Sequence, residues 1–463
     1  MDLLPPQHDF FGFLHVDLNS FFASVEQQLH PEYRNRPLAV VPTFADTTVA
    51  IAASYEAKAL GIKTGTRVGD MKQICPEILL VQGDHTTYAE FSHRIHAAVE
   101  RCCPVAHVPS IDEVTCQLIG REQDPPRARE IAFAIKQAIR DDVGDTLRCS
   151  IGMAPNRYLA KIASDMQKPD GLIGLLPSQL PRSLEPLELR DLPGVGARTE
   201  LMLNQKGITT MPQLLALSRA EMHTLWNSVW GDRLYHWLRG HSTGDDGAPV
   251  PRETQQSLGH SHVLAPEHRT PEGAWAVAHK LLHKAAMRLR MEHFCAGTLS
   301  LTIRYQVTRV NGGSDSLPEP GTHSYTSETV SVPAESNRKL RQHHSGIQHH
   351  NWGMEARFPA TQDTLSLLEA LRELWQQQPT RAGTGRPFFV GVTLNRLTDE
   401  RAQQPDLFRD TNARNELSRA LDRLNLKHGH TTVHFAGMLP ARDSAPTRIA
   451  FTQIPVQYGV DYM

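Results

Sequence analysis

The sequence has no long apolar run. Among its 463 residues, no uninterrupted hydrophobic stretch approaches the roughly 18 residues that span a membrane. The N-terminal residues 1–6 also show no basic region ahead of an apolar segment, which a secretory signal would need. We therefore expect a cytosolic protein without a membrane partner.

Cysteine is scarce, and its spacing excludes the usual cysteine-based sites. None of the six cysteines forms a C-x-x-C pair, and the neighbouring Cys102 and Cys103 cannot easily bridge within one strand. We predict reduced, structural cysteines. The His-rich segment 341–350 (RQHHSGIQHH) has no cysteine partners and is polar, so we predict a mobile loop there rather than a metal site.

An excess of one charge is also missing. The 48 basic and 50 acidic residues give a net charge of −2, which neither favours nor excludes nucleic acid as a partner. Charge is nevertheless uneven, because residues 279–310 carry basic side chains at six positions and only Glu292 as an acid. That segment is either a polyanion-binding face or an ordinary solvated helix face.

What is present is typical of a large globular protein. Hydrophobic residues make up 40% and charged residues 21% of the chain, which excludes wholesale disorder, collagen and coiled-coil arrays. A chain of this length is expected to form about three domains.

Strands and helices alternate in the N-terminal third. Residues 11–17 (FGFLHVD) are a predicted buried strand, and a helical pattern follows at 20–29. Helical spacing returns at 87–102 and 126–143, and residues 105–118 between them indicate two strands joined by a turn. The order predicts an α/β or α+β sheet domain.

The composition then changes twice. Residues 38–71 indicate short strands around a helix near 55–60, but from Leu175 to about Gly240 the pattern is a run of short helices. Residues 241–252 are rich in Gly, Pro and Asp and lack apolar periodicity, which predicts a linker.

A second sheet domain should follow the linker. Its predicted elements are a strand at 253–264, a helix at 272–292, strands at 297–308 and 324–332, a helix at 362–377 and a strand at 387–396. This order indicates a small α/β sandwich with a polar insertion. From Thr398 the chain is a predicted tail with a short motif and an amphipathic helix at 411–426.

Three carboxylates are candidates for a metal site. Asp17 lies at the end of the first predicted strand, and Asp112 and Glu113 are adjacent. Neighbouring strand residues point to opposite faces, so Asp112 and Glu113 converge only if the chain turns, which Pro109 and Ser110 make plausible. Gathered carboxylates suit a pair of Mg²⁺ ions, although acidic residues at strand ends are commonly only solvated.

The segments that hold these carboxylates resemble the two signature motifs of Y-family translesion DNA polymerases. They are His15–Glu26 (HVDLNSFFASVE) and Ser110–Val114 (SIDEV). The resemblance continues in order along most of the chain and is closest to the bacterial DNA polymerase IV branch. The further matching segments are Ser54–Ile62, Ala160–Gly171, Leu192–Arg198 and Ser257–Val263.

The resemblance implies an α+β multidomain, right-hand polymerase. The palm would carry the carboxylates, small fingers and a helical thumb would follow, and an α/β little finger would come after the linker. The corresponding ranges are palm 1–28 and 87–174, fingers 29–86, thumb with helix-hairpin-helix 175–240, linker 241–252, little finger 253–397 and tail 398–463.

The same resemblance assigns the metal ligands of two Mg²⁺ ions. Asp17 and Asp112 would bridge the metals, and Glu113 would complete the site of the metal that activates the primer hydroxyl. The Leu18 carbonyl would serve the nucleotide metal. Asp17, Asp112 and Glu113 are thus the implied catalytic residues.

The nucleotide site would depend on scattered cations, because the chain has no G-x-x-x-x-G-K-[ST] loop. The resemblance implies that Lys58, Lys168 and the Tyr55 hydroxyl contact the phosphates. The family usually has arginine in place of Lys58 and a hydroxyl residue in place of Ala52. Since lysine cannot make the bidentate phosphate contact of arginine, we expect weaker nucleotide affinity.

Phe22 is implied to press against the incoming sugar, so that a 2′-hydroxyl would clash. The alternative is ordinary core packing, because aromatics in such a helix are usually buried. Its neighbour Phe21 is expected in the core.

DNA contacts are implied in the thumb and the little finger. The G-x-G turn of Gly194 and Gly196 would bind a DNA phosphate through backbone N–H groups. The basic segment 279–310 would become a phosphate-tracking face. Its implied contact residues are Lys280, Lys284 and Arg304.

The tail contains a pentapeptide, Gln404–Phe408 (QPDLF), that resembles the bacterial sliding-clamp motif. Leu407 and Phe408 would enter a hydrophobic pocket of the clamp while Gln404 makes polar contacts. The alternative is a strand-to-helix connector whose phenylalanine packs internally. In polymerase IV proteins this motif commonly ends the chain, whereas here the chain continues to Met463.

The expected protein is a template-directed, Mg²⁺-dependent polymerase that performs error-prone translesion synthesis as a monomer near the bacterial nucleoid. Its partners would be primer-template DNA, deoxynucleoside triphosphates and the sliding clamp. One alternative is a non-enzymatic damage-tolerance adaptor, against which the complete set Asp17, Asp112 and Glu113 argues. Another is a two-metal nuclease, which has no use for a sugar-gating Phe22.

Overall fold

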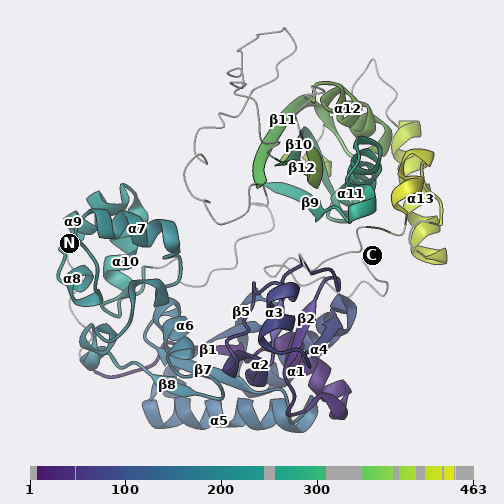
Figure 1. Ribbon diagram of the computed structural model, residues 1–463. Coiled ribbons are helices and arrows are strands. Elements are labelled where there is room, and N and C mark those ends of the chain that lie inside the picture. Colours follow the sequence, from purple (N-terminus) through teal and green to yellow (C-terminus); the bar gives the residue numbers. More distant parts are fainter. Residues whose placement is uncertain are drawn as a thin grey trace. The chain divides into compact units, whose positions relative to one another are not determined.

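The computed structural model describes residues 8–46, 48–243, 256–308, 347–378, 385–402, 412–429, 432–442 and 444. The chain divides into two compact units. The first contains Met1–Pro249 and Arg448–Tyr458, and the second contains Val250–Thr447 and Gly459–Met463. Figure 1 labels the elements of both units.

A five-stranded sheet lies at the centre of the first unit, with strand order β5-β6-β1-β7-β8. The central strand β1 is buried along its whole length and pairs antiparallel with both β6 and β7. The strands are β1 (Phe13–Leu18), β5 (Val105–Ser110), β6 (Glu113–Gln117), β7 (Cys149–Ala154) and β8 (Leu172–Gly174). The predicted first strand and the predicted pair at 105–118 are thereby confirmed.

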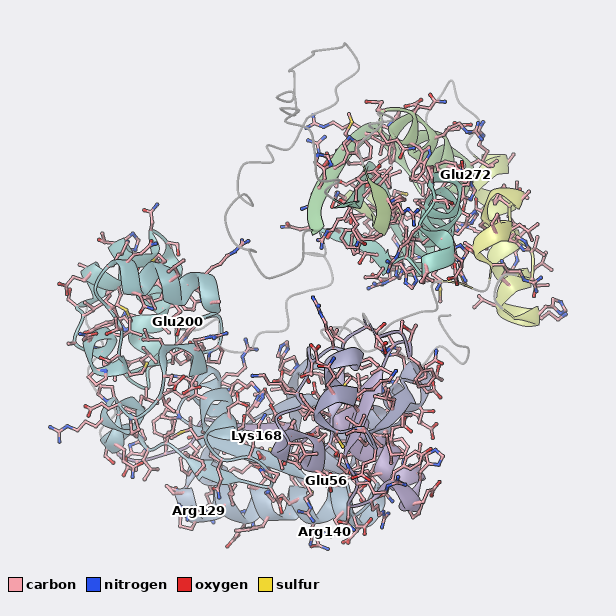
Figure 2. The ribbon with its side chains drawn as sticks, in the orientation of Figure 1. Glu56, Arg129, Arg140, Lys168, Glu200 and Glu272 are labelled. Atoms are coloured by element: carbon pink, nitrogen blue, oxygen red, sulfur yellow. The ribbon has the colours of Figure 1, made fainter. Side chains whose placement is uncertain are left out.

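Helices cover both faces of this sheet. Leu14, Val16 and Leu18 share one core with α1 (Phe21–Leu29), α4 (His85–Cys102) and α5 (Pro125–Asp142). The outer face of α5 carries exposed arginines, and Figure 2 labels Arg129 and Arg140 there. Phe13 instead joins the core of α6 (Arg157–Met166). Because side chains alternate along a strand, His15 and Asp17 lie on the α6 face.

A smaller sheet, of order β3-β2-β4, has its own hydrophobic core. Its Ser54 caps helix α2 by accepting a hydrogen bond from the Ala57 backbone N–H, which fixes the start of that helix. The elements are η1 (Pro31–Tyr33), β2 (Leu38–Val41), β3 (Ala52–Ala53), α2 (Tyr55–Ala59), α3 (Val68–Ile74) and β4 (Leu79–Gln82). The predicted short strands and helix are confirmed.

Short helices complete the first unit and confirm the predicted all-helical stretch. Those between Arg182 and Trp237 share one hydrophobic core with α6 and Phe13. The Asn156 side-chain amide also donates to the Trp237 carbonyl at 2.9 Å, which ties the last helix to the sheet. The helices are η2 (Gly120–Gln123), η3 (Pro177–Gln179), η4 (Arg182–Leu184), η5 (Leu189–Asp191), α7 (Ala197–Gln205), α8 (Met211–Leu215), α9 (Arg219–Trp226) and α10 (Val229–Trp237).

The second unit is a four-stranded antiparallel sheet of order β11-β10-β12-β9, with helices packed on one face. The strands are β9 (Ser257–Val263), β10 (Phe294–Thr308), β11 (Ile347–Thr361) and β12 (Arg386–Asp399). The helices are η7 (Pro266–His268), α11 (Pro271–Met291), α12 (Thr364–Gln376), η9 (Glu400–Ala402), α13 (Asn412–His428) and η10 (Ala436–Ala441).

One prediction for this unit needs correction. Residues 347–350, the end of the His-rich segment, begin strand β11 instead of forming a loop, because they pair with residues 305–308 of β10. Strand pairing here outweighs polar composition. The predicted tail helix is present as α13, and its Asp422 binds Arg290 of α11. The predicted strand at 324–332 lies outside the described residues.

Across the described part of the chain, no helix combines the length and the apolar character needed to cross a membrane.

Candidate active site

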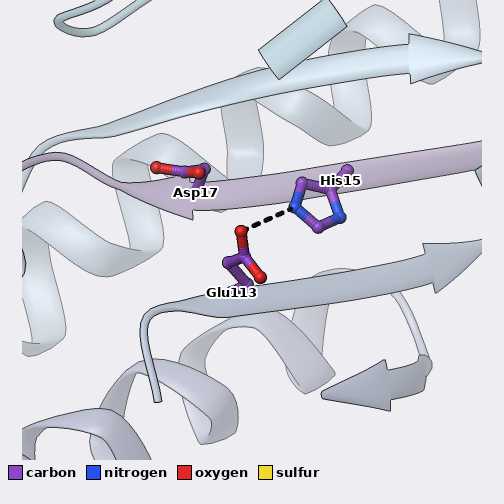
Figure 3. Close-up of side chains that lie close together, drawn as sticks. All are labelled: His15, Asp17 and Glu113. Atoms are coloured by element: carbon purple, nitrogen blue, oxygen red, sulfur yellow. Dashed lines mark ion pairs between the residues drawn. The ribbon is translucent and has the colours of Figure 1, made fainter. Parts of the chain in front are cut away.

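Asp17 and Glu113 face each other across neighbouring strands. They are register partners in the β1–β6 pair, and Figure 3 shows their carboxylates beside the His15 imidazole. The ligand atoms of these three residues lie within 4.8 Å of one another. Because Mg²⁺ prefers carboxylate oxygens, the Asp17–Glu113 pair fits a divalent metal.

Asp112 reaches the same site from a turn. Residues 111–112 connect β5 to β6, and the Leu18 backbone N–H donates to the Asp112 carbonyl at 2.9 Å. The Ser110 hydroxyl donates to Asp112 Oδ1 at 2.6 Å. The turn that Pro109 and Ser110 predicted is therefore present, and it allows adjacent acidic residues to converge.

The pKa of Asp112 lies above its usual value. Burial raises the pKa of Asp112, and the charges of Asp17 and Glu113 raise it further, against the hydrogen bond from Ser110. A nearby divalent cation would favour the ionised form of all three carboxylates.

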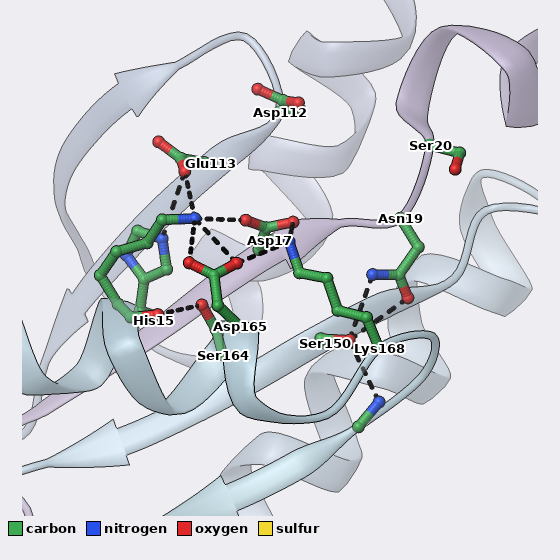
Figure 4. A network of polar contacts seen from close by, with 12 residues as sticks. His15, Asp17, Asn19, Ser20, Asp112, Glu113, Ser150, Ser164, Asp165 and Lys168 are labelled. Carbon is green, nitrogen blue, oxygen red and sulfur yellow. Dashed lines mark hydrogen bonds and ion pairs between the residues drawn. The ribbon is translucent and has the colours of Figure 1, made fainter. Parts of the chain in front are cut away.

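Two lysines supply positive charge to the cluster. Lys161 Nζ lies 2.5 Å from Asp17 Oδ2 and 2.6 Å from Glu113 Oε1. Lys168 Nζ lies 2.6 Å from Asp17 Oδ1. Asp165 accepts from both lysines, at 3.1 Å from Lys161 and 2.8 Å from Lys168. Figure 4 shows this network.

These ion pairs shift the pKa values of both partners. Burial opposes ionisation of Glu113, but the His15 hydrogen bond and the Lys161 ammonium hold the pKa of Glu113 well below its usual range. Burial would lower the pKa of Lys161, yet Asp17, Glu113 and Asp165 raise it well above its usual range. The glutamate and the lysine therefore remain a charged pair at neutral pH.

A close helix–sheet approach brings Lys161 to the carboxylates. Gly152 on β7 stands opposite His15, and a Cβ at that position would lie 2.0 Å from the Ala160 carbonyl of α6. Glycine is thus the residue that lets the backbone of α6 touch the sheet.

A cavity of about 210 Å³ opens beside the carboxylates. It lies between β1, the start of α1 and the β3–α2 segment, so it is bounded by both sheets of the first unit. Its lining residues are Asp17, Leu18, Ser20, Phe21, Phe22, Ile51, Ala52, Ala53, Lys58, Thr64, Asp112 and Lys168. The structure thus brings together most of the residues assigned to metal and nucleotide binding.

Lys58 lines the other side of this cleft, and Tyr55 lies next to it. The Lys58 ammonium lies 4.5 Å from the centre of the Tyr55 ring and donates to the Ser20 hydroxyl at 2.7 Å. Ser20 has a left-handed backbone conformation at the start of α1, with φ of 51°. Ala52 lines the cleft without a hydroxyl, as expected, and Thr64 brings a hydroxyl to the same cavity.

Phe22 packs in the core, and its predicted contact with the incoming sugar stays a prediction. Its side chain is only 4% exposed and stacks on Tyr88 with ring centres 4.2 Å apart, so it packs in the core. It also lines the cleft. Phe21 is equally buried, at 3% exposure.

The residues assigned to DNA lie in different environments. Gly194 (φ 89°) and Gly196 are exposed at the N-terminus of α7. Arg304 is exposed on β10 with its guanidinium 4.4 Å from the Phe389 ring centre. These three positions are open to a phosphate, and the contact stays a prediction.

The two lysines of α11 do not share that exposure. Lys280 is 6% exposed, and its ammonium donates to the Arg442 and Ser444 carbonyls. Its ammonium thus binds the backbone that directly follows η10, and its contact with a DNA phosphate stays a prediction. Burial, reinforced by Lys280, lowers the pKa of the partly buried Lys284 to about 7.

The implied clamp motif, with Gln404, Leu407 and Phe408, lies outside the described residues. Within them, sequence reasoning missed His15, Lys161 and Asp165. His15 stands two residues before Asp17, which places both on one strand face. The spacing of Lys161, Asp165 and Lys168 is i, i+4, i+7, one face of a helix, and could have indicated a charged stripe.

Residues 16–165 match the impB/mucB/samB family, and residues 255–407 match the C-terminal domain of the same family. The chain is similar to DNA polymerase IV of Moorella thermoacetica, with 31% identity over 424 residues, 91% of this chain and 94% of that protein. It is 29% identical over 431 residues to DNA polymerase IV of Pelotomaculum thermopropionicum, covering 92% and 95% of the two chains.

A Y-family DNA polymerase chimera of known structure has the same fold. It is 23% identical in sequence, with a TM-score of 0.61, over 84% of this chain and 99% of the chimera. The chain therefore belongs to the Y family of DNA polymerases, among the relatives of bacterial DNA polymerase IV.

Proposed function

We propose that this chain copies template DNA by two-metal nucleotidyl transfer and performs error-prone synthesis past damaged bases. The observation that carries the proposal is the convergence of Asp17 and Asp112 on a cleft that Lys58 and Lys168 also line. Glu113 stands opposite Asp17 in register. Membership of the family supports the same activity.

The carboxylates would hold the metals. Asp17, Asp112, Glu113 and the Leu18 carbonyl would bind two Mg²⁺ ions, which activate the primer hydroxyl and neutralise charge on the leaving phosphate. The Asp17–Glu113 geometry fits one such ion. The fixed strand register pre-organises these oxygens before substrate arrives.

The cleft would hold the deoxynucleoside triphosphate. Lys58 and Lys168 approach it from the fingers and the palm, and each offers a single point charge to phosphate oxygens. The Tyr55 hydroxyl is a further donor. Phe22 would exclude a 2′-hydroxyl, because its ring is fixed by the stack on Tyr88.

Primer-template DNA would be held outside the cleft. The exposed N-terminus of α7, with Gly194 and Gly196, offers backbone N–H groups to a phosphate. Arg304 on β10 offers a cation from the second unit. Gln404, Leu407 and Phe408 would attach the chain to a sliding clamp.

Primer extension with Glu113→Gln tests this proposal. The substitution keeps the size of the side chain but removes the charge that a metal needs, so extension should fall by about a thousandfold or more. Primer-template affinity, measured by fluorescence anisotropy, should change little. The matched control is Glu130→Gln on the exposed face of α5, which should extend as the wild type does.

The same assay separates the alternatives. A wild-type chain that binds DNA but never extends a primer is an adaptor, and one that shortens the primer is a nuclease. Undiminished synthesis by Glu113→Gln would contradict the two-metal site.

A further inference from the structure

The ammonium group of Lys161 contacts two of the proposed metal ligands. Lys161 Nζ is within 2.6 Å of oxygens from both Asp17 and Glu113, and Figure 4 labels these two acidic residues together with Asp165. Lys168, the other lysine at the cluster, contacts Asp17 but not Glu113 among the described ion pairs.

The ammonium and a metal ion cannot both keep these contacts. A divalent cation needs lone pairs of the same two carboxylates, and it repels a positive charge a few ångströms away. Binding a metal between Asp17 and Glu113 therefore requires Lys161 Nζ to move.

The structure offers Lys161 a second acceptor. Asp165 lies one turn further along α6, with Oδ2 at 3.1 Å from Lys161 Nζ. The Asp165 side chain is 37% exposed, compared with 8% for Asp17, so it can accept the ammonium near solvent. A rotamer change of one flexible lysine would suffice.

We propose that Lys161 competes with the metal for Asp17 and Glu113, and that Asp165 receives its ammonium when the metal binds. The proposal rests on the proposed function for the identity of the metal ligands. Lys161 is then a positioning residue that weakens metal binding to the free protein, while it neutralises carboxylates that would otherwise repel one another.

Manganese binding to the full-length chain, without DNA or nucleotide, tests the competition. Mn²⁺ gives a direct readout, since the electron paramagnetic resonance signal of the free ion disappears on binding. Lys161→Gln should bind Mn²⁺ about tenfold more tightly than the wild type. Lys58→Gln is the control, because Lys58 lies at the same site but its ammonium contacts the Ser20 hydroxyl. Removing this charge should change the Mn²⁺ affinity less than about twofold.

A second variant shifts the affinity in the opposite direction. Asp165→Asn takes away the alternative acceptor, so Mn²⁺ should bind more weakly, and this loss should disappear in the Lys161→Gln background. The control Asp170→Asn removes a carboxylate that pairs with Lys136 instead. Circular dichroism verifies the fold of each variant, and if Lys161→Gln fails to fold, the comparison of Asp165→Asn with Asp170→Asn decides the question.

The outcomes separate the two proposals. If Glu113→Gln leaves Mn²⁺ binding unchanged, the metal site itself is wrong. If Glu113→Gln abolishes binding but Lys161→Gln does not tighten it, or tightens it no more than Lys58→Gln does, the competition is overturned and the metal site remains.

Discussion

Phe22 is buried in the core and also forms part of the cleft wall, where we propose that it selects the sugar. Its ring is held by Tyr88 and still forms part of the cleft wall. A sugar gate has to be rigid, because a ring that could rotate away would admit the larger ribose. The core contact is therefore compatible with the proposed discrimination.

Phe22→Ala should let ribonucleotides compete with deoxynucleotides. A methyl group leaves room for the 2′-hydroxyl, so the ratio of deoxy- to ribonucleotide incorporation should fall by about tenfold or more. Single-nucleotide incorporation kinetics give this ratio. Phe21→Ala is the control, because Phe21 is equally buried and loses a similar amount of packing. If only Phe21→Ala changes the ratio, the gate is Phe21.

Single residues were predictable where a motif marks them. Asp17, Asp112 and Glu113 stand in segments whose order along the chain resembles one family. The ion pairs of Lys161 could not be predicted in this way. They depend on the close approach of α6 to the sheet at Gly152, which is a contact between segments far apart in the sequence. Spacing within one helix shows which residues share a face, but not what that face meets.

At the scale of elements, a buried ion pair is one of the contacts that attach α13 to the second unit. Arg290 is 5% exposed and binds both oxygens of Asp422, at 2.6 and 2.8 Å. It also donates to the Gln362 carbonyl and the Thr364 hydroxyl, so its charge stays in the interior whether or not Asp422 is present.

Asp422→Asn should destabilise the second unit. It leaves a buried guanidinium without its counter-charge, which costs about 3 kcal/mol. Calorimetric melting of the full chain should show a lower transition temperature for this unit. Glu369→Gln breaks the exposed Arg414–Glu369 pair between α13 and α12, and should cost less than about 1 kcal/mol. Equal effects of the two substitutions would show that the Arg290–Asp422 pair contributes nothing beyond surface attraction.

The elements themselves were mostly predictable from periodicity, since β1, α4 and α5 have clear apolar patterns. The start of β11 could not be predicted from periodicity. Its histidines and glutamine carry no strand signal of their own, and they extend the sheet because β10 offers a long partner with unpaired backbone groups.

At the scale of the whole molecule, attachment to a clamp should be separable from chemistry. The carboxylate cluster and the cleft are formed by residues between His15 and Lys168, which precede the predicted motif Gln404–Phe408 in the sequence. Leu407→Ala combined with Phe408→Ala should therefore leave unassisted synthesis intact and eliminate stimulation by the sliding clamp. Two apolar anchors contribute about 1.5–3 kcal/mol each by burial, enough to lose a micromolar contact.

Clamp-loaded primer extension and a pull-down with the clamp measure this effect, with wild type beside the double variant. Equal stimulation of both would assign Leu407 and Phe408 to internal packing.

The order of a first sheet domain, a run of short helices and a second sheet domain could be anticipated from the pattern of the sequence. The docking of α13 on the second unit could not, because an exposed tail and a docked helix have the same amphipathic pattern.

The strand β1 also restricts how such a site can change during evolution. Leu14, Val16 and Leu18 fill one core while His15 and Asp17 face α6, so inserting or deleting one residue would exchange the two sets. The proposed metal ligand Asp17 therefore cannot shift along this strand one residue at a time, because each such shift would turn it toward the hydrophobic core. The β3–α2 segment contributes Ala52 and Lys58 to the cleft wall, and substitutions there leave the register of the carboxylates unchanged.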